Sequence, residues 1–212
     1  GIRFFLWDSQ FGRFFNTGPI KGKGDKLFFL HTLLWAFLPW SLIMYAALYS
    51  RIRQGIKKVS APFTEWFTLC SCLLTLLVFS FSGFQLPHYT NIIFPMLAIL
   101  SAVLIDQQVN RGQTVFGKIQ NGLVVLLLIL VGGLLFFYRP AFSIVFIVTG
   151  LLLLTLLLFL PKFSVVDKQW YPYLRSGIAV LFVAVFLNLC FYPDLLRYQS
   201  GNLAATYMNK QY

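Results

Sequence analysis

Long uncharged apolar runs alternate along the chain with short segments that carry the basic residues. Six runs are long enough to predict membrane-spanning helices: 27–50, 62–82, 89–105, 120–138, 140–160 and 176–192. A spanning helix needs about 20 apolar residues because the hydrocarbon core of a bilayer is about 30 Å thick. The pattern therefore predicts an all-α fold, a polytopic transmembrane helix bundle over residues 27–192.

Proline and glycine set the predicted breaks in this pattern. Pro39 lies inside the first run and is expected to kink that helix. The uncharged stretch 66–105 is too long for one helix, and Gly83 and Pro87 divide it into two. We therefore expect a short turn between the second and third spans.

The composition agrees with a membrane protein. Hydrophobic residues make up 58% of the chain and charged residues only 11%, whereas a soluble domain carries about 25% charged residues. The 24 Phe and 10 Tyr fit a lipid-facing exterior with aromatic belts. Three cysteines, all inside apolar runs, argue against a disulfide framework or a zinc site.

The net charge of +11 would suggest nucleic acid in a soluble protein, but here the basic residues are dispersed between apolar runs. Among the loops between predicted spans, they concentrate after the first, third and fifth spans, at Arg51, Arg53, Lys57, Lys58, Arg111, Lys118, Lys162, Lys168 and Arg175, whereas the two end segments carry Arg3, Arg13, Lys21, Lys23, Lys26, Arg197 and Lys210. The internal loops therefore decide the orientation. By the positive-inside rule the loops after the first, third and fifth spans are cytoplasmic, and both ends of the chain lie on the outer face. We expect no nucleic-acid partner. Anionic ligands such as lipid phosphates remain a second explanation of the charge.

Two segments flank the predicted bundle. Residues 1–26 form an outer-face amphipathic segment, in which aromatic residues gather on one side at helical spacing, as in a helix lying in the membrane interface: Phe4, Trp7, Phe11, Phe14 and Phe15. Two interpretations fit this segment: an amphipathic connector without a functional role, or one wall of a functional site. Residues 193–212 form an outer-face tail. The start at Gly1 suggests a fragment with residues missing at both ends.

Motifs of soluble enzymes are absent from the sequence. It contains no Gly-x-Ser-x-Gly, no Cys-x-x-Cys and no His-Glu-x-x-His. No two acidic residues are close enough in sequence to form an obvious catalytic pair among Asp8, Asp25, Glu65, Asp106, Asp167 and Asp194. The sequence therefore identifies neither a catalytic residue nor a metal site.

Two constellations on the predicted outer face mix aromatic residues with hydrogen-bond donors. One runs from Trp7 to Arg13, and the other is the turn from Ser82 to Tyr89. This mixture suits a pocket for an amphiphile with a polar head. Arginine is the best single donor to phosphate because its planar fork can bond two oxygens.

These segments carry a resemblance to a known family. The chain resembles the C-terminal transmembrane part of bacterial glycosyltransferase family 39, the protein O-mannosyltransferase-like group that includes the lipid A aminoarabinose transferases. The matching motifs are Phe4-Phe5-Leu6-Trp7, Arg13-Phe14, Pro39-Trp40, the turn Ser82–Tyr89 followed by Phe94-Pro95, and Tyr192–Tyr198. Two departures stand out: Ser9-Gln10 replaces the family's Glu-His pair, and Gln85 stands where lysine is usual.

The resemblance implies a GT-C type membrane glycosyltransferase of the bacterial cytoplasmic membrane. Such an enzyme moves a sugar from a polyprenyl-phosphate donor to a lipid, glycan or protein acceptor on the outer face, with inversion. The family's catalytic carboxylate lies in an N-terminal half that this sequence lacks, so the chain alone is expected to be inactive. The cofactor is unknown, and the resemblance leaves open a divalent cation in the full-length protein.

Within this chain, the resemblance and the two constellations together suggest which residues hold the donor. Arg13, His88, Tyr89 and Gln85 are the candidate contacts to the lipid phosphate, and Trp7 and Gln10 are candidate pocket walls. The alternative class is a non-enzymatic multi-pass protein in contact with membrane lipids, either a transporter or flippase subunit or a scaffold. Nothing in the sequence identifies the sugar or the acceptor.

Overall fold

The computed structural model describes residues 1–17, 22, 24–56, 66–139, 142–163, 167–197, 201 and 207–208. Every regular element in this part of the chain is a helix, which confirms the all-α prediction. The chain divides into two compact units, Gly1–Arg111 and Gly112–Tyr212. The boundary lies in the polar turn after residue 110, inside the range predicted to form one bundle, and Gly112 there has a φ of +67°.

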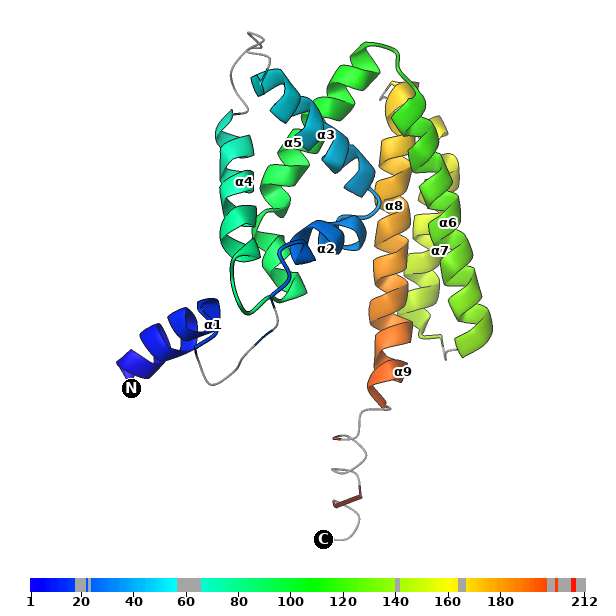
Figure 1. The fold of residues 1–212 in the computed structure, drawn as a ribbon. Coiled ribbons are helices and arrows are strands. Elements are labelled where there is room, and N and C mark those ends of the chain that lie inside the picture. Colours follow the sequence, from blue (N-terminus) through cyan, green and yellow to red (C-terminus); the bar gives the residue numbers. More distant parts are fainter. Residues whose placement is uncertain are drawn as a thin grey trace. The chain divides into compact units, whose positions relative to one another are not determined.

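The first unit begins with a short helical segment and continues with four longer helices (Figure 1). Its elements are the π-helix η1 (Phe4–Phe11), α1 (Gly12–Phe14), α2 (Phe28–Ala36), α3 (Ser41–Ile56), α4 (Trp66–Ser80), the 3-10 helix η2 (Pro87–Ile92) and α5 (Phe94–Asn110). Helices α3 and α4 both pack on α5, and α2 packs across α3 and α4. The buried core side chains include Phe29, Leu33, Ile43, Met44 and Leu97.

The region predicted as one kinked span, 27–50, is two separate helices in the structure. Helix α2 ends at Ala36, and α3 begins at Ser41 after a turn that contains Pro39. Proline has no N–H to continue a helical ladder, and its ring clashes with the preceding turn. The nine residues of α2 extend about 14 Å, too short to cross a bilayer alone.

The later predicted spans lie close to observed helices, with shifted ends. Helix α5 starts at Phe94 and runs to Asn110, because η2 occupies the first residues of the predicted span 89–105. The start of the predicted span 62–82, with Lys57 and Lys58 before it, lies outside the described residues. So do most residues of the predicted tail 193–212.

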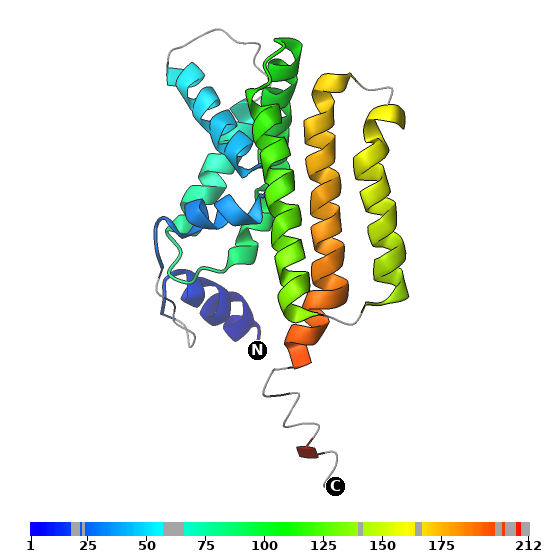
Figure 2. The same cartoon turned by 90° about the vertical axis from the view of Figure 1, so that its right-hand side faces the viewer.

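The second unit is built from three long helices, and α8 lies between α6 and α7 (Figure 2). Its elements are α6 (Val115–Tyr138), α7 (Ile144–Phe163), the 3-10 helix η3 (Lys168–Trp170), α8 (Tyr171–Phe186), the π-helix η4 (Leu187–Phe191) and α9 (Tyr192–Arg197). One buried cluster joins all three long helices: Val131, Phe146, Phe182, Phe186 and Cys190.

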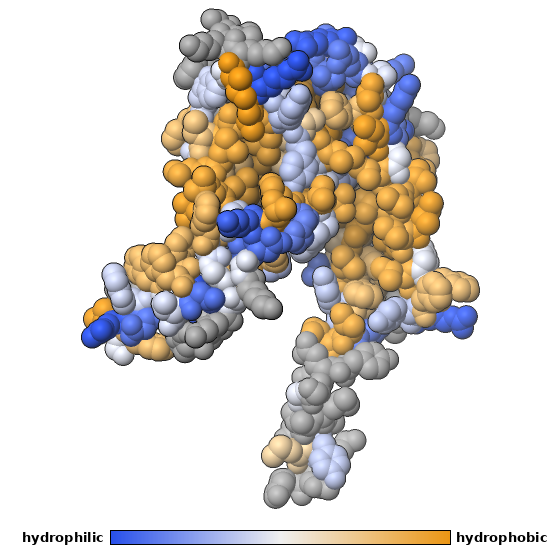
Figure 3. All heavy atoms as spheres, viewed as in Figure 1, coloured by the Kyte–Doolittle hydropathy of each residue, from blue (hydrophilic) through white to orange (hydrophobic). Residues whose placement is uncertain are grey.

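Two helices of the described chain are long and apolar enough to cross a membrane. These are Val115–Tyr138 and the continuous helical stretch Lys168–Leu196. Only 11% of the most apolar window of the first helix is buried, so Ile129 and Phe137, for example, point outward. In Figure 3 apolar side chains cover the middle of this unit's visible face, and polar ones gather toward its ends. Such an apolar exterior suits lipid better than water.

Candidate functional site

The N-terminal segment is attached to the turn that follows α4. The main-chain N–H of Gly83 donates to the carbonyl oxygen of Phe14 at 2.8 Å. A Cβ built on Gly83 would lie 2.7 Å from the Cβ of Asn16, so only glycine fits this approach. The side chain of Asn16 also bonds the backbone of Gly22 in both directions, at 2.9 and 2.8 Å. The structure therefore brings together the two constellations that the sequence singled out.

Arg13 lies at this junction. It is partly buried, and its guanidinium carbon is 5.8 Å from the centroid of the Phe84 ring. A cation–π contact uses the face of the ring and does not consume the N–H donors of the guanidinium. Arg13 is thus held in place by an aromatic ring while its donors stay available to an anion.

His88 and Tyr89 lie further along the same turn, packed on α4. The Tyr89 ring stacks on Phe79 at 5.5 Å between centroids, and His88 meets Tyr89 edge-on at 4.9 Å. The hydroxyl of Thr90 donates to the carbonyl of Pro87 at 2.7 Å and fixes the turn. His88 is exposed, whereas Tyr89 is half-buried. Phe79 of α4 orders the Tyr89 ring, which in turn contacts His88. The Phe84 ring orders Arg13.

Gln85 has a structural role that the sequence did not reveal. Its side-chain N–H groups donate to the carbonyls of Phe79 and Ser80 at 3.4 and 3.2 Å, at the C-terminal end of α4. Its side-chain oxygen accepts from the main-chain N–H of Asp25 at 2.9 Å. Gln85 thus satisfies carbonyls that a helix end leaves unpaired and ties α4 to the chain before α2. Its predicted contact to phosphate is not tested by this geometry.

An apolar pocket of about 380 Å³ opens against the N-terminal segment, and Arg13 is not among its lining residues. It is lined by Phe11, Phe14 and Phe15 from the N-terminal segment and by Val78 from α4. Its volume falls within the range of small-molecule pockets, roughly 300–1,000 Å³. The ring of Trp7 packs against that of the lining residue Phe11, with 4.8 Å between centroids and an angle of 32° between the ring planes. The other predicted wall residue, Gln10, has a side chain outside the described part of the structure.

The described residues offer no metal centre near the pocket. They contain no group of three or more His, Cys, Asp or Glu side chains that could hold an ion. Asp25, whose main-chain N–H donates to Gln85, accepts the main-chain N–H of Leu27 at 3.0 Å through its carboxylate just before α2. What the site combines is an arginine, two ring side chains with polar atoms and an apolar pocket.

Comparison with known proteins adds no relative. No protein family, no curated protein and no solved structure matches this chain. The fold and the site therefore define a helical protein with two helices suited to crossing a membrane. The resemblance to family 39 remains a prediction from the quoted motifs.

Proposed function

We propose that this chain is the C-terminal transmembrane part of a glycosyltransferase that uses a polyprenyl-phosphate sugar. The observation that carries the proposal is the apolar pocket of Phe11, Phe14, Phe15 and Val78, formed largely by the N-terminal segment that also carries Arg13. A polyprenyl phosphate is an apolar chain joined to an anionic head. The pocket offers the chain an apolar wall, and the arginine offers the head a bidentate donor.

In the proposed reaction an acceptor hydroxyl attacks the anomeric carbon of the sugar. The bond between that carbon and the phosphate oxygen breaks, and polyprenyl phosphate leaves with the electron pair. Arg13 stabilises the charge that builds on the leaving phosphate, and His88 and Tyr89 add donors from the turn. The hydroxyl proton passes to a carboxylate supplied by the part of the enzyme outside this chain.

The proposed setting is the bacterial cytoplasmic membrane, crossed six times, with both chain ends on the outer face. Helices α4 and α5, with 15 and 17 residues, extend about 22–26 Å and would span with the help of flanking residues. The basic residues after the first, third and fifth predicted spans support the orientation.

A non-enzymatic membrane protein is the alternative, and one observation favours it. Asp25, the described carboxylate tied to the candidate turn, is already engaged at the start of α2. A pocket that only holds a lipid needs no base. The two proposals differ in one outcome. The glycosyltransferase moves the sugar of the bound donor to an acceptor, whereas the non-enzymatic protein binds the donor without transferring its sugar.

The test is turnover of the full-length protein in proteoliposomes with a pool of polyprenyl-phosphate sugars. Arg13→Ala should slow transfer about ten- to a hundredfold, the value of one lost charge-assisted hydrogen bond in a water-poor site. Arg13→Lys should restore only part of the rate because a point charge cannot bond two oxygens in one plane. The 212-residue chain alone should bind the donor without transferring sugar.

Arg3→Ala is the matched control, since Arg3 is an exposed arginine of the same N-terminal segment. It should leave turnover unchanged at equal membrane expression. Equal rates for Arg13→Lys and the unaltered enzyme would mean that Arg13 only meets lipid head groups. Donor binding without transfer by the full-length protein would support the non-enzymatic alternative.

A further inference from the structure

A cavity with several polar and cationic lining residues lies where α6 and α8 begin. It measures about 260 Å³ and is formed entirely within the second unit. The two helices run in the same direction and pack side by side (Figures 1 and 2). Their close approach depends on Gly117, where a Cβ would lie 3.2 Å from the Cγ of Pro172. The cavity is therefore built into the contact between the two helices that can cross a membrane.

The lining of this cavity is cationic and rich in hydrogen-bond donors. Two lysines contribute charge, Lys118 from α6 and Lys168 from η3, while Thr114, Asn121 and Gln169 contribute hydroxyl and amide groups. None of the described residues that line it is acidic. The carboxylate of Asp167, next to Lys168, accepts the main-chain N–H of Gln169 at 3.2 Å and caps η3.

Helix ends add to this positive field. The first N–H groups of a helix have no partner within it, and the aligned peptide dipoles leave a partial positive charge there. Thr114 precedes the 24 residues of α6 and makes no side-chain capping bond. Because α6 and α8 are parallel, the positive ends of both dipoles face the same cavity.

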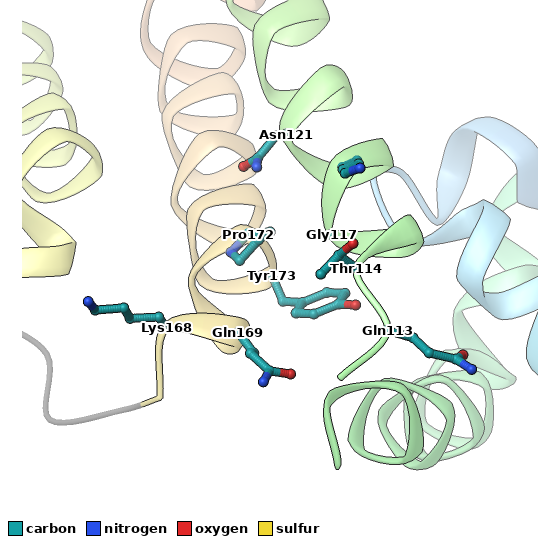
Figure 4. Close-up of a pocket in the computed structure, with 9 residues that line it drawn as sticks. Gln113, Thr114, Gly117, Asn121, Lys168, Gln169, Pro172 and Tyr173 are labelled. Carbon is teal, nitrogen blue, oxygen red and sulfur yellow. The ribbon is translucent and has the colours of Figure 1, made fainter. Parts of the chain in front are cut away.

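Figure 4 shows how the side chains are arranged. The ring of Tyr173, a buried residue of α8, extends toward the first turn of α6, beside Thr114. Lys168 extends away from Tyr173 and is exposed. The lysine stem has four flexible carbons, so its ammonium can reach a ligand at the mouth of the cavity.

We propose that this cavity binds the phosphate group of an anionic ligand, and that in the membrane this ligand is an anionic phospholipid. Its two helices are long and apolar enough to cross a bilayer, so their shared N-terminal ends lie at one membrane surface. Lipid phosphates are concentrated at that depth. Basic pockets between transmembrane helices are suited to lipid head groups. This site shares no lining residue with the apolar pocket of Phe11, Phe14, Phe15 and Val78.

The test measures lipid retention by native mass spectrometry. The chain is reconstituted in phosphatidylcholine nanodiscs in which a titrated fraction of the lipid is replaced by phosphatidylglycerol. The protein is then released from the nanodiscs, and the lipid that it retains is measured. Lys118→Gln and Lys168→Gln should each weaken phosphatidylglycerol binding about fivefold, because each substitution removes the attraction of one cation for the anionic membrane surface. Retention of phosphatidylcholine should not change. A second arm adds inorganic phosphate to phosphatidylcholine discs and follows thermal unfolding.

The matched control is Arg53→Gln, which removes an exposed cation from α3 in the first unit. It should not affect retention of phosphatidylglycerol. Stabilisation by inorganic phosphate that is lost in Lys118→Gln, without selective lipid retention, would support the phosphate site and assign it to a soluble ligand. Equal losses in Arg53→Gln and Lys118→Gln, or no response to either ligand, would overturn the proposal. Far-ultraviolet circular dichroism checks that each variant keeps its helices.

Discussion

The main-chain N–H of Gly83 donates to the carbonyl of Phe14 across a 2.8 Å bond. This bond joins the N-terminal aromatic segment to the turn after α4, two parts of the chain that are far apart in sequence. Phe14 lines the apolar pocket, and its neighbour Arg13 lies over the ring of Phe84, the residue after Gly83. The pocket and the cation are thus positioned by one main-chain contact.

Replacing Gly83 should detach the N-terminal segment. In Gly83→Ala the new methyl group would lie 2.7 Å from the Cβ of Asn16, and overpacking of this kind costs about 1–3 kcal/mol. Hydrogen–deuterium exchange of the amides in residues 1–17 should rise about five- to a hundredfold. Gly132→Ala, where a Cβ meets nothing within 4 Å, is the control. Unchanged exchange in Gly83→Ala would show that the segment is held by other contacts.

Gln85→Ala should destabilise the first unit. The substitution removes one acceptor for the Asp25 N–H and the donor to the carbonyls at the end of α4. Net hydrogen bonds contribute about 0.5–1.5 kcal/mol each, so the thermal midpoint should fall by several degrees, about 4–8 °C per kcal/mol in a domain of this size.

Gln107→Ala, which shortens a partly buried glutamine of α5, serves for comparison. Gln85→Lys separates structure from function, because it introduces the lysine that is usual in family 39, the family the motifs resemble, but lysine cannot accept a hydrogen bond. A gain in donor affinity together with a lower thermal midpoint would assign Gln85 to both roles. A thermal midpoint unaffected by Gln85→Ala would contradict the structural role.

Shortening Phe15 should reduce the preference for long prenyl chains. Phe15→Ala removes apolar surface from the pocket lining, which is worth about 1–3 kcal/mol for a fully engaged side chain. In the full-length enzyme the KM for a long-chain donor should rise about tenfold at most, and the KM for a short-chain analogue should stay constant. Phe5→Ala, at an exposed phenylalanine of the same segment outside the pocket lining, is the control. Parallel changes in both KM values would argue against a chain-binding pocket.

Cysteine labelling tests the proposed orientation. Arg53→Cys labels the C-terminal end of α3, where Arg53 is exposed, whereas a Cβ at nearby Gly55 would lie 2.2 Å from the Trp66 ring. In a Cys70→Ser background, which removes the exposed native thiol, Gly201→Cys should react with an impermeant maleimide in intact cells. Arg53→Cys should react only after permeabilisation. The opposite pattern would reverse the orientation.

Apolar continuity was enough to locate the later helices. The apolar runs 120–138 and 141–160 predict the helices α6 and α7 from sequence because neither run contains a charge or a proline. The observed helices are longer than these runs, since α6 begins before Lys118 and α7 continues past Pro161 to Phe163. The first run failed as a single span because the length of an apolar run does not reveal how far the chain turns at Pro39. Hydropathy also gives no indication that residues Phe4–Phe11 adopt π-helical hydrogen bonding.

The candidate site was predictable only in part. Aromatic spacing pointed to Trp7 and Phe11, whose rings are 4.8 Å apart, and to the turn that holds His88 and Tyr89. The contact that joins these segments uses a main-chain N–H and a main-chain carbonyl. Nearly every residue carries these groups, so the residue types along the chain do not predict the contact. The bonds of Gln85 were hidden for a related reason, since its partners are also main-chain groups.

Two features hold the N-terminal segment to the turn after α4: a bond between backbone atoms and the absence of a side chain at Gly83. Both affect how the protein can evolve. Exchange of the phenylalanine at position 14 would leave the carbonyl that Gly83 binds in place. The residues that shape the pocket are therefore decoupled from the contact that holds the pocket together. If the pocket holds a prenyl chain as proposed, point mutations of its lining could change the length or branching of the chain that fits, provided that position 83 stays glycine.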